Sequence, residues 1–159
     1  MLIELNKEKI DQNLLKKIKK FYFGEEKDNK LLLNYYEVFY LIEEEKENFL
    51  EKKLQKKVLD FINENYCIYL VFKDLIKKNF IVKSGLKYGS HFRIYLKKDY
   101  ENKEHSKYLI IVLNSFENIK TNFLISLFRI SHSVKKRVIL SFVDSEGDII
   151  YYECKWLRI

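Results

Sequence analysis

The run YLIIVL, residues 108–113, constrains the fold of this chain most strongly. It is apolar throughout and rich in β-branched side chains. An unbroken apolar run of this length is typical of a strand buried on both faces, whereas a half-exposed strand alternates polar and apolar residues. The sequence therefore predicts a sheet with this strand in its interior.

The segments around this run alternate between strand and helix patterns. Helical spacing runs from Tyr66 to near Lys78 and over residues 123–130. Further strands are expected at residues 80–83, 92–96, 137–143 and 149–157, the last two joined by the turn DSEGD. These elements predict a compact α/β domain with a central mixed sheet over residues 66–159.

Residues 1–65 show a different pattern. Apolar residues recur at helical spacing over residues 10–21, 33–42 and 54–62, which predicts helices throughout this segment. The charged run EEEKE at residues 43–47 is typical of a solvated helix face or turn. The predicted class is α+β or mixed α/β, with a small, mostly helical N-terminal domain over residues 1–65.

The excess of positive over negative charge lies entirely in the second domain. The net charge is +7, with 13 Lys and Arg against 14 Asp and Glu in residues 1–65, and 17 against 9 in residues 66–159. An excess of this kind suits a polyphosphate partner, because neutralising phosphates releases counterions. A Lys-rich, well-solvated surface explains the composition equally well.

Cys67 and Cys154 are far apart, with no CxxC spacing, so we expect reduced thiols and no metal site. No apolar run approaches the roughly eighteen residues of a membrane span. The N-terminus also lacks the pattern of a signal peptide. We expect a cytoplasmic protein with no membrane partner.

Three residues near predicted strand ends can act together on RNA. Tyr95 ends one strand, His105 precedes the apolar strand, and Lys136 precedes another. Attack by a 2′-hydroxyl on the adjacent phosphate needs a base, an acid for the leaving 5′-oxygen and a cation for the charge on phosphorus. Such a scheme requires no metal and no cofactor.

The motifs carrying these residues match a known family. The run YLVFKDLIKKNFIVKSGLKYGSHFRIY, followed by EHSKYLIIV, RISHSVKKRVILSFV and DSEGDIIYYECKW, resembles the archaeal-type tRNA-splicing endonucleases. The resemblance covers residues 66–159. It implies a nuclease-like catalytic subunit that cuts precursor tRNA at the bulge-helix-bulge of intron-exon junctions. It also implies a metal-independent reaction that leaves a 2′,3′-cyclic phosphate and a 5′-hydroxyl.

The resemblance assigns roles to individual residues. Tyr95 corresponds to the general base, His105 to the general acid and Lys136 to the residue that stabilises the transition state. Arg129, seven positions before that lysine, corresponds to a side chain that clamps a flipped bulge base, and Trp156 is the candidate for its partner. Guanidinium and indole groups both stack on bases.

Two motifs depart from the family pattern. KYGSHFR stands where relatives commonly have KYGADFR, so Ser90 and His91 replace a small residue and an acid. We interpret His91 as a structural or RNA-facing residue and not as the general acid. HSVKK stands where relatives often have HSVRK, and Lys135 keeps the charge but lacks the bidentate fork of arginine.

The resemblance also implies assembly into a tetramer. By this reading Asp144, Glu146 and Asp148, in the acidic turn, insert into a basic pocket of a neighbouring subunit. The tetramer then consists either of four identical chains or of two copies of this chain with two copies of a homologous non-catalytic subunit. The divergent first sixty residues favour the heterotetramer.

Each site residue has a simpler explanation, and two other functions compete. Taken singly, Tyr95 could pack in a core, and His105 and Lys136 could be solvated. Glu153-Cys154-Lys155 is a literal ExK sequence, which metal-dependent restriction-type nucleases use with an upstream aspartate, here Asp148. The chain could also be a non-catalytic, RNA-binding structural subunit, although such subunits should lack the Tyr-His-Lys set.

Overall fold

The computed structural model describes residues 1–115 and 118–155. The chain divides into two compact units, Met1–Tyr69 and Leu70–Ile159. None of the helices among the described residues has the length and apolar character that a membrane crossing requires.

The N-terminal unit combines a small antiparallel sheet with helices. Its strands, in spatial order, are β1 (Leu2–Asn6), β3 (Lys30–Asn34) and β2 (Glu25–Lys27). Its helices are η1 (Lys7–Lys9), α1 (Gln12–Lys20), α2 (Tyr35–Glu43) and α3 (Lys52–Glu64). Helix α4 (Tyr66–Lys77) begins in this unit and continues into the next.

The expectation of helices throughout this segment was wrong, because three strands are present. The stretch predicted as a helix over residues 33–42 begins instead as β3, in which Leu31 and Leu33 are buried and Leu32 between them is less so. The switch to helix occurs at Asn34, whose side chain accepts the backbone N–H of Glu37 while the Glu37 carboxylate accepts that of Asn34. This reciprocal capping box ends the strand and starts α2.

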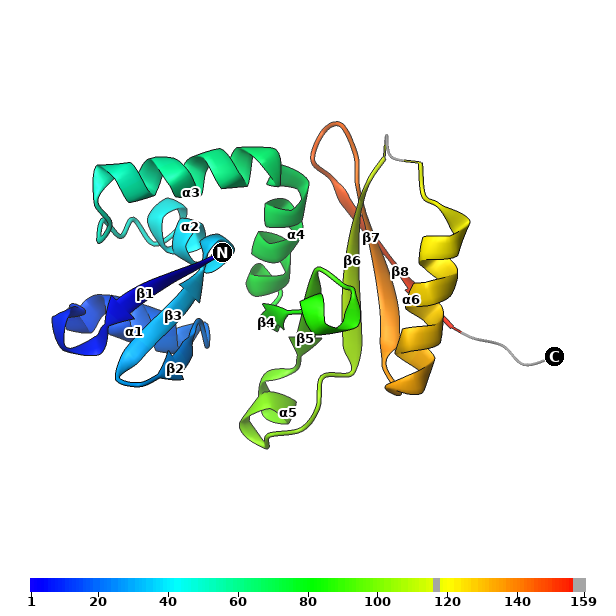
Figure 1. Ribbon diagram of the computed structural model, residues 1–159, viewed down its shortest axis with the longest axis horizontal. Coiled ribbons are helices and arrows are strands. Elements are labelled where there is room, and N and C mark those ends of the chain that lie inside the picture. The colour runs from blue at the N-terminus through cyan, green and yellow to red at the C-terminus, as the bar shows by residue number, and fades with distance from the viewer. Residues whose placement is uncertain (116–117, 156–159) are drawn as a thin grey trace. The chain divides into compact units, whose positions relative to one another are not determined.

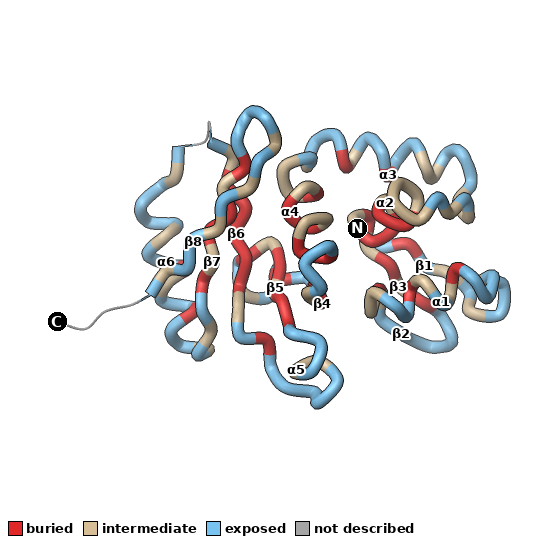
Figure 2. The backbone as a smooth tube through the Cα atoms, turned by 180° about the vertical axis from the view of Figure 1, so that it is seen from behind, coloured by how far each residue is buried: buried red, intermediate tan, exposed pale blue. Residues whose placement is uncertain are grey.

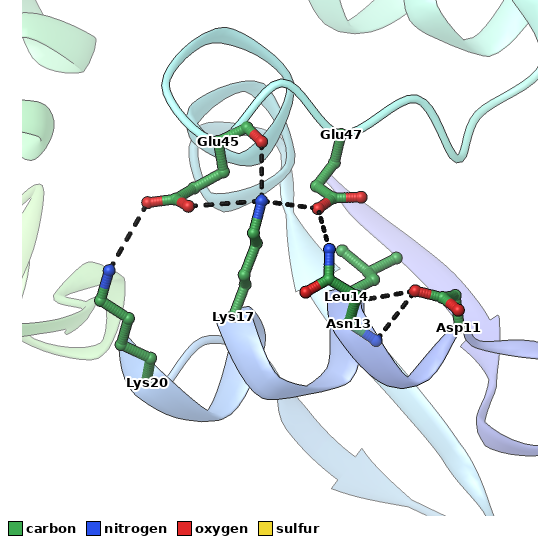
Figure 3. A network of polar contacts seen from close by, with 7 residues as sticks. All are labelled: Asp11, Asn13, Leu14, Lys17, Lys20, Glu45 and Glu47. Carbon is green, nitrogen blue, oxygen red and sulfur yellow. Dashed lines mark hydrogen bonds and ion pairs between the residues drawn. The ribbon is translucent and has the colours of Figure 1, made fainter.

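Helix α1 is tied to the segment that follows α2 by a polar network (Figure 3). Its first turn is capped by the Asp11 carboxylate, and Lys17 in its middle contacts Glu45 and Glu47. The run EEEKE, expected to be a solvated face or turn, thus includes two carboxylates that anchor a neighbouring helix.

The C-terminal unit is built on a five-stranded mixed sheet. Its order is β4 (Ile81–Ser84), β5 (Phe92–Tyr95), β6 (Tyr108–Asn114), β7 (Arg137–Val143) and β8 (Ile149–Cys154). β6 and β7 are parallel and the other neighbouring pairs are antiparallel. The connections contain η2 (Leu86–Tyr88), α5 (Lys97–Glu101) and α6 (Thr121–Ser133). The predicted α+β class with a central mixed sheet is confirmed.

Both faces of this sheet are covered, so its interior strands are buried (Figures 1 and 2). Helix α6 packs on one face through Leu127, against Ile111 and Val138. On the other face, Phe72 of α4 contacts Phe92, and the Tyr151 hydroxyl donates a hydrogen bond of 2.5 Å to Asp74. The apolar run that predicted an interior strand is β6, and its residues 109–113 are all buried.

Candidate active site

Three strand ends meet at one edge of the C-terminal sheet. The ladder pairs at this edge are Ile94 with Tyr108, between β5 and β6, and Tyr108 with Arg137, between β6 and β7. Tyr95 directly follows the first pair, His105 lies in the loop before β6, and Lys136 directly precedes β7. The topology therefore brings residues 95, 105 and 136 to the same edge, although forty-one positions separate the first from the last.

Lys136 makes direct contact with the segment that carries His105. Its ammonium donates to the backbone carbonyl and, at 3.0 Å, to the hydroxyl of Ser106, and it lies 5.4 Å from the centre of the Tyr88 ring. Burial lowers the pKa of Lys136; the Tyr88 hydroxyl opposes this shift, and the positive charge of Arg93 adds to it. The lysine is thus held in place by uncharged groups.

Tyr95 is buried at the end of β5. Its ring packs edge-on against Tyr100 of α5, with ring centres 5.2 Å apart, and the Arg93 guanidinium lies 5.8 Å from its centre. Because side chains two apart in a strand share a face, Arg93 and Tyr95 point to the same side of the sheet. On that side Lys83 lies opposite Arg93 in the ladder. Two cations thus share the face of the sheet on which Tyr95 lies, which suits a site that receives a phosphate.

His105 is exposed in the short loop between α5 and β6. The loop is fixed on both sides of the histidine by Asp99. The Asp99 carbonyl accepts the backbone N–H of Glu104 at 2.8 Å, and its carboxylate lies 3.0 Å from the Lys107 ammonium. An exposed imidazole on an anchored loop is accessible to a large substrate, and the loop needs little rearrangement for the imidazole to contact it.

Arg129 lies on the exposed side of α6, about one turn before the helix ends. The C-terminal end of α6 leads through Lys136 into the start of β7 (Figure 1), and Arg129 lies four residues before that end of the helix. Trp156, the other predicted RNA-binding residue, lies outside the described residues.

The acidic turn lies at the opposite end of β7 from Lys136. The Asp144 carboxylate accepts the backbone N–H groups of Glu146 and Asp148, each at 2.9 Å, and Gly147 adopts a positive φ of 86°. Asp144 therefore shapes the turn, while Glu146 and Asp148 are exposed on it. The structure does not bring these three residues to the candidate active site.

The alternative ExK site lacks a compact set of ligands. Glu153 accepts a hydrogen bond of 3.2 Å from Arg137, and Asp148 lies at the other end of β8. Five residues of extended chain span about 17 Å, which is too far for two carboxylates to share an ion. Within residues 1–115 and 118–155, no three His, Cys, Asp or Glu side chains are grouped as metal ligands.

The sequence interpretation missed three residues of this edge. Tyr88, Arg93 and Ser106 all lie within the quoted motifs, and the alternation of side chains along β5 could have placed Arg93 beside Tyr95. The contact of Lys136 with Ser106 and Tyr88 depends on strand order and could not be read from spacing. His91 makes a structural contact, since its Nδ1 accepts the Val112 backbone N–H at 3.0 Å.

Comparison with known proteins places this geometry in a family. The model of the tRNA intron endonuclease, catalytic C-terminal domain, matches residues 65–151. The tRNA-splicing endonuclease of Pyrococcus abyssi is 40% identical over 147 residues, which cover 86% of this chain and 82% of the relative. That of Thermococcus gammatolerans is 35% identical over 156 residues, covering 93% and 91%. The chain belongs to the tRNA-splicing endonuclease family.

The family match covers most of the candidate site. Tyr95, His105, Arg129 and Lys136 all lie within the matched domain, as does the acidic turn. Trp156 and the Glu153-Cys154-Lys155 sequence lie beyond it. The similarity to relatives also covers the N-terminal unit. The tRNA-splicing endonuclease of Methanococcus vannielii is 32% identical over 159 residues, and the alignment covers 94% of this chain and 88% of the relative. The similarity to tRNA-splicing endonucleases therefore extends over both units.

Proposed function

We propose that this chain is the catalytic subunit of a tRNA-splicing endonuclease. It cleaves precursor tRNA at intron-exon junctions, within a bulge-helix-bulge, by a metal-independent acid-base reaction. The observation that supports this most directly is the shared sheet edge, where Lys136 is hydrogen-bonded to the residue after His105 and Tyr95 ends the adjacent strand. Membership of the tRNA-splicing endonuclease family supports an RNA substrate.

Each of the three residues has one chemical task in this proposal. Tyr95 removes the proton of the 2′-hydroxyl, and the 2′-oxygen attacks the adjacent phosphorus. The bond from phosphorus to the 5′-oxygen breaks, and His105 donates its proton to that oxygen. The Lys136 ammonium stabilises the negative charge that accumulates on the non-bridging oxygens. The products are a 2′,3′-cyclic phosphate and a 5′-hydroxyl.

Replacement of the acid tests this function. His105→Ala should slow single-turnover cleavage of a bulge-helix-bulge RNA by about 10²- to 10⁴-fold, the usual contribution of general acid-base catalysis. Gel-shift affinity for the RNA should be unchanged. His132→Ala, which removes an exposed histidine from α6, is the matched control and should cleave normally. Unchanged cleavage by His105→Ala would exclude the acid assignment.

Product analysis and chelation separate the proposal from its two competitors. Cyclic phosphate ends that form equally fast in EDTA are expected, whereas a restriction-type nuclease would stop on chelation. A chain that binds the RNA, fails to cut it alone and leaves cleavage to an added paralogue would be the structural subunit.

Assembly is the second part of the proposal. We infer that the acidic turn is an assembly element, with Asp144 shaping it and Glu146 and Asp148 presenting charge to a basic partner surface. A tetramer with a non-catalytic paralogue is slightly favoured over a homotetramer. Light scattering on the purified chain, followed by a cleavage assay without a partner, distinguishes them: an active homotetramer would exclude the need for a paralogue.

A further inference from the structure

Ser106 is a buried polar residue with no role in the scheme above. It lies between His105 and the first residues of β6 and is only 4% exposed. Both of its oxygens accept hydrogen bonds from the Lys136 ammonium, the carbonyl at 2.5 Å and the hydroxyl at 3.0 Å. A buried hydroxyl with a charged partner in an active site is a candidate for a functional contact.

We propose that Ser106 is a positioning residue that holds the Lys136 ammonium beside the loop of His105 without neutralising its charge. This inference rests on the proposed function of Lys136 and adds a residue to that site. Because Ser106 directly follows His105 in the chain, its two hydrogen bonds fix the lysine relative to the backbone that carries the general acid.

The chemistry of the acceptors explains why a serine suits this position. A carboxylate would hold the ammonium equally well but would cancel the charge that a phosphate needs. A carbonyl and a hydroxyl orient the ammonium and leave its charge available. Lysine has a long, flexible side chain, so a fixed starting position reduces the rearrangement needed before reaction.

The ring of Tyr88 supports the ammonium as a second uncharged group, 5.4 Å away. Tyr88 is held by a tight turn that requires glycine at position 85. A side chain there would place its Cβ 2.2 Å from the Ser90 hydroxyl and 2.8 Å from the backbone of Phe92. The aromatic face attracts a cation and is not a carboxylate that would form an ion pair with it.

The hydrogen bonds also oppose the loss of the proton from Lys136. Burial and the nearby Arg93 favour the neutral amine, and both lower the pKa of Lys136. Acceptors that bind the protonated form favour that form. Removal of the Ser106 hydroxyl should therefore shift the alkaline limb of the cleavage rate to lower pH, a change that a purely structural serine would not produce.

Three variants of the full chain test the inference by single-turnover cleavage of a bulge-helix-bulge RNA. Ser106→Ala should lower the maximal rate about tenfold, the loss expected for one hydrogen bond to a charged group, with the RNA concentration at half-maximal rate unchanged. Ser106→Thr, which keeps the hydroxyl, should recover most of this loss. Ser141→Ala is the matched control, because Ser141 is fully buried and its hydroxyl has no partner among the described residues.

A double-mutant cycle separates positioning from general damage. If Ser106 acts through Lys136, Ser106→Ala should cause little further loss in a Lys136→Met background. A normal rate for Ser106→Ala, a loss equal to that of Ser141→Ala, or the same loss in the Lys136→Met background would overturn the inference. Normal cleavage by Lys136→Met itself would instead reject the proposed function of the lysine, so the two failures are distinct.

Discussion

Lys17 in the N-terminal unit and Lys136 in the C-terminal unit are held in opposite ways. The Lys17 ammonium lies 2.7 Å from the Glu47 carboxylate and 3.5 Å from that of Glu45 (Figure 3). Lys136 contacts a carbonyl, a hydroxyl and an aromatic ring. Hydrogen bonding to Glu47 raises the pKa of Lys17, whereas burial lowers that of Lys136. A neutralised lysine joins two parts of a fold, whereas an ammonium held by uncharged groups stays available to an anion.

The largest expected contrast is in activity. Lys136→Ala should slow cleavage of a bulge-helix-bulge RNA by about 10²- to 10³-fold, the usual loss when one group that stabilises transition-state charge is removed. Lys17→Ala should cleave normally, because its charge is already matched by carboxylates. Single-turnover rates with saturating enzyme measure both. Equal losses of cleavage rate in the two variants would contradict the comparison. They would show that contact with carboxylates or with uncharged groups does not distinguish a structural lysine from a catalytic one.

Arg129 extends the comparison to RNA binding. Arg129→Ala should weaken affinity for the bulge about tenfold, the loss expected from one stacked cation. Lys30→Ala is the control, since this exposed lysine pairs with Glu4 at 2.8 Å in the N-terminal unit. Affinity is best measured by gel shift on an RNA with 2′-deoxy residues at the cleavage positions. Normal affinity of Arg129→Ala would remove its clamp role.

The elements around the candidate site could be read from the sequence, because their patterns are strong. The apolar run of β6 predicted an interior strand, and the strand predicted at residues 137–143 is β7 with the same bounds. The N-terminal sheet could not be read in this way. β2 and β3 are short, and the pattern of Leu31 to Leu33 fits a helix as well as a strand. Only the capping box at Asn34 shows where β3 ends and α2 begins.

The same limit applies to the site. The placement of Tyr95, His105 and Lys136 at one edge follows from strand order, and the family resemblance singled out these three residues from the sequence. The contacts of Lys136 with Ser106 and Tyr88 link segments 30 and 48 positions away. Periodicity describes one element at a time, so contacts of this range appear only when the elements are packed.

The smallest expected contrast is in stability, and it has opposite signs for the two lysines. A raised folded-state pKa means that protonated Lys17 stabilises the fold below the ordinary lysine value of 10.5, an effect lost as pH rises through the folded pKa. For Lys136 the lowered pKa means that protonation costs stability below the folded value, and this cost disappears as pH rises toward 10.5. Lys17→Met should therefore lower Tm slightly, and Lys136→Met should leave it unchanged or raise it.

Thermal unfolding from about pH 7 to about pH 10 measures both signs. The deficit of Lys17→Met should persist over this range, whereas any gain of Lys136→Met should shrink as the wild-type ammonium loses its proton. A clear fall in Tm for Lys136→Met at neutral pH would contradict the contrast. It would mean that the contacts with Ser106 and Tyr88 stabilise the fold as the carboxylates of Lys17 do, and that Lys136 is not held at a cost to stability.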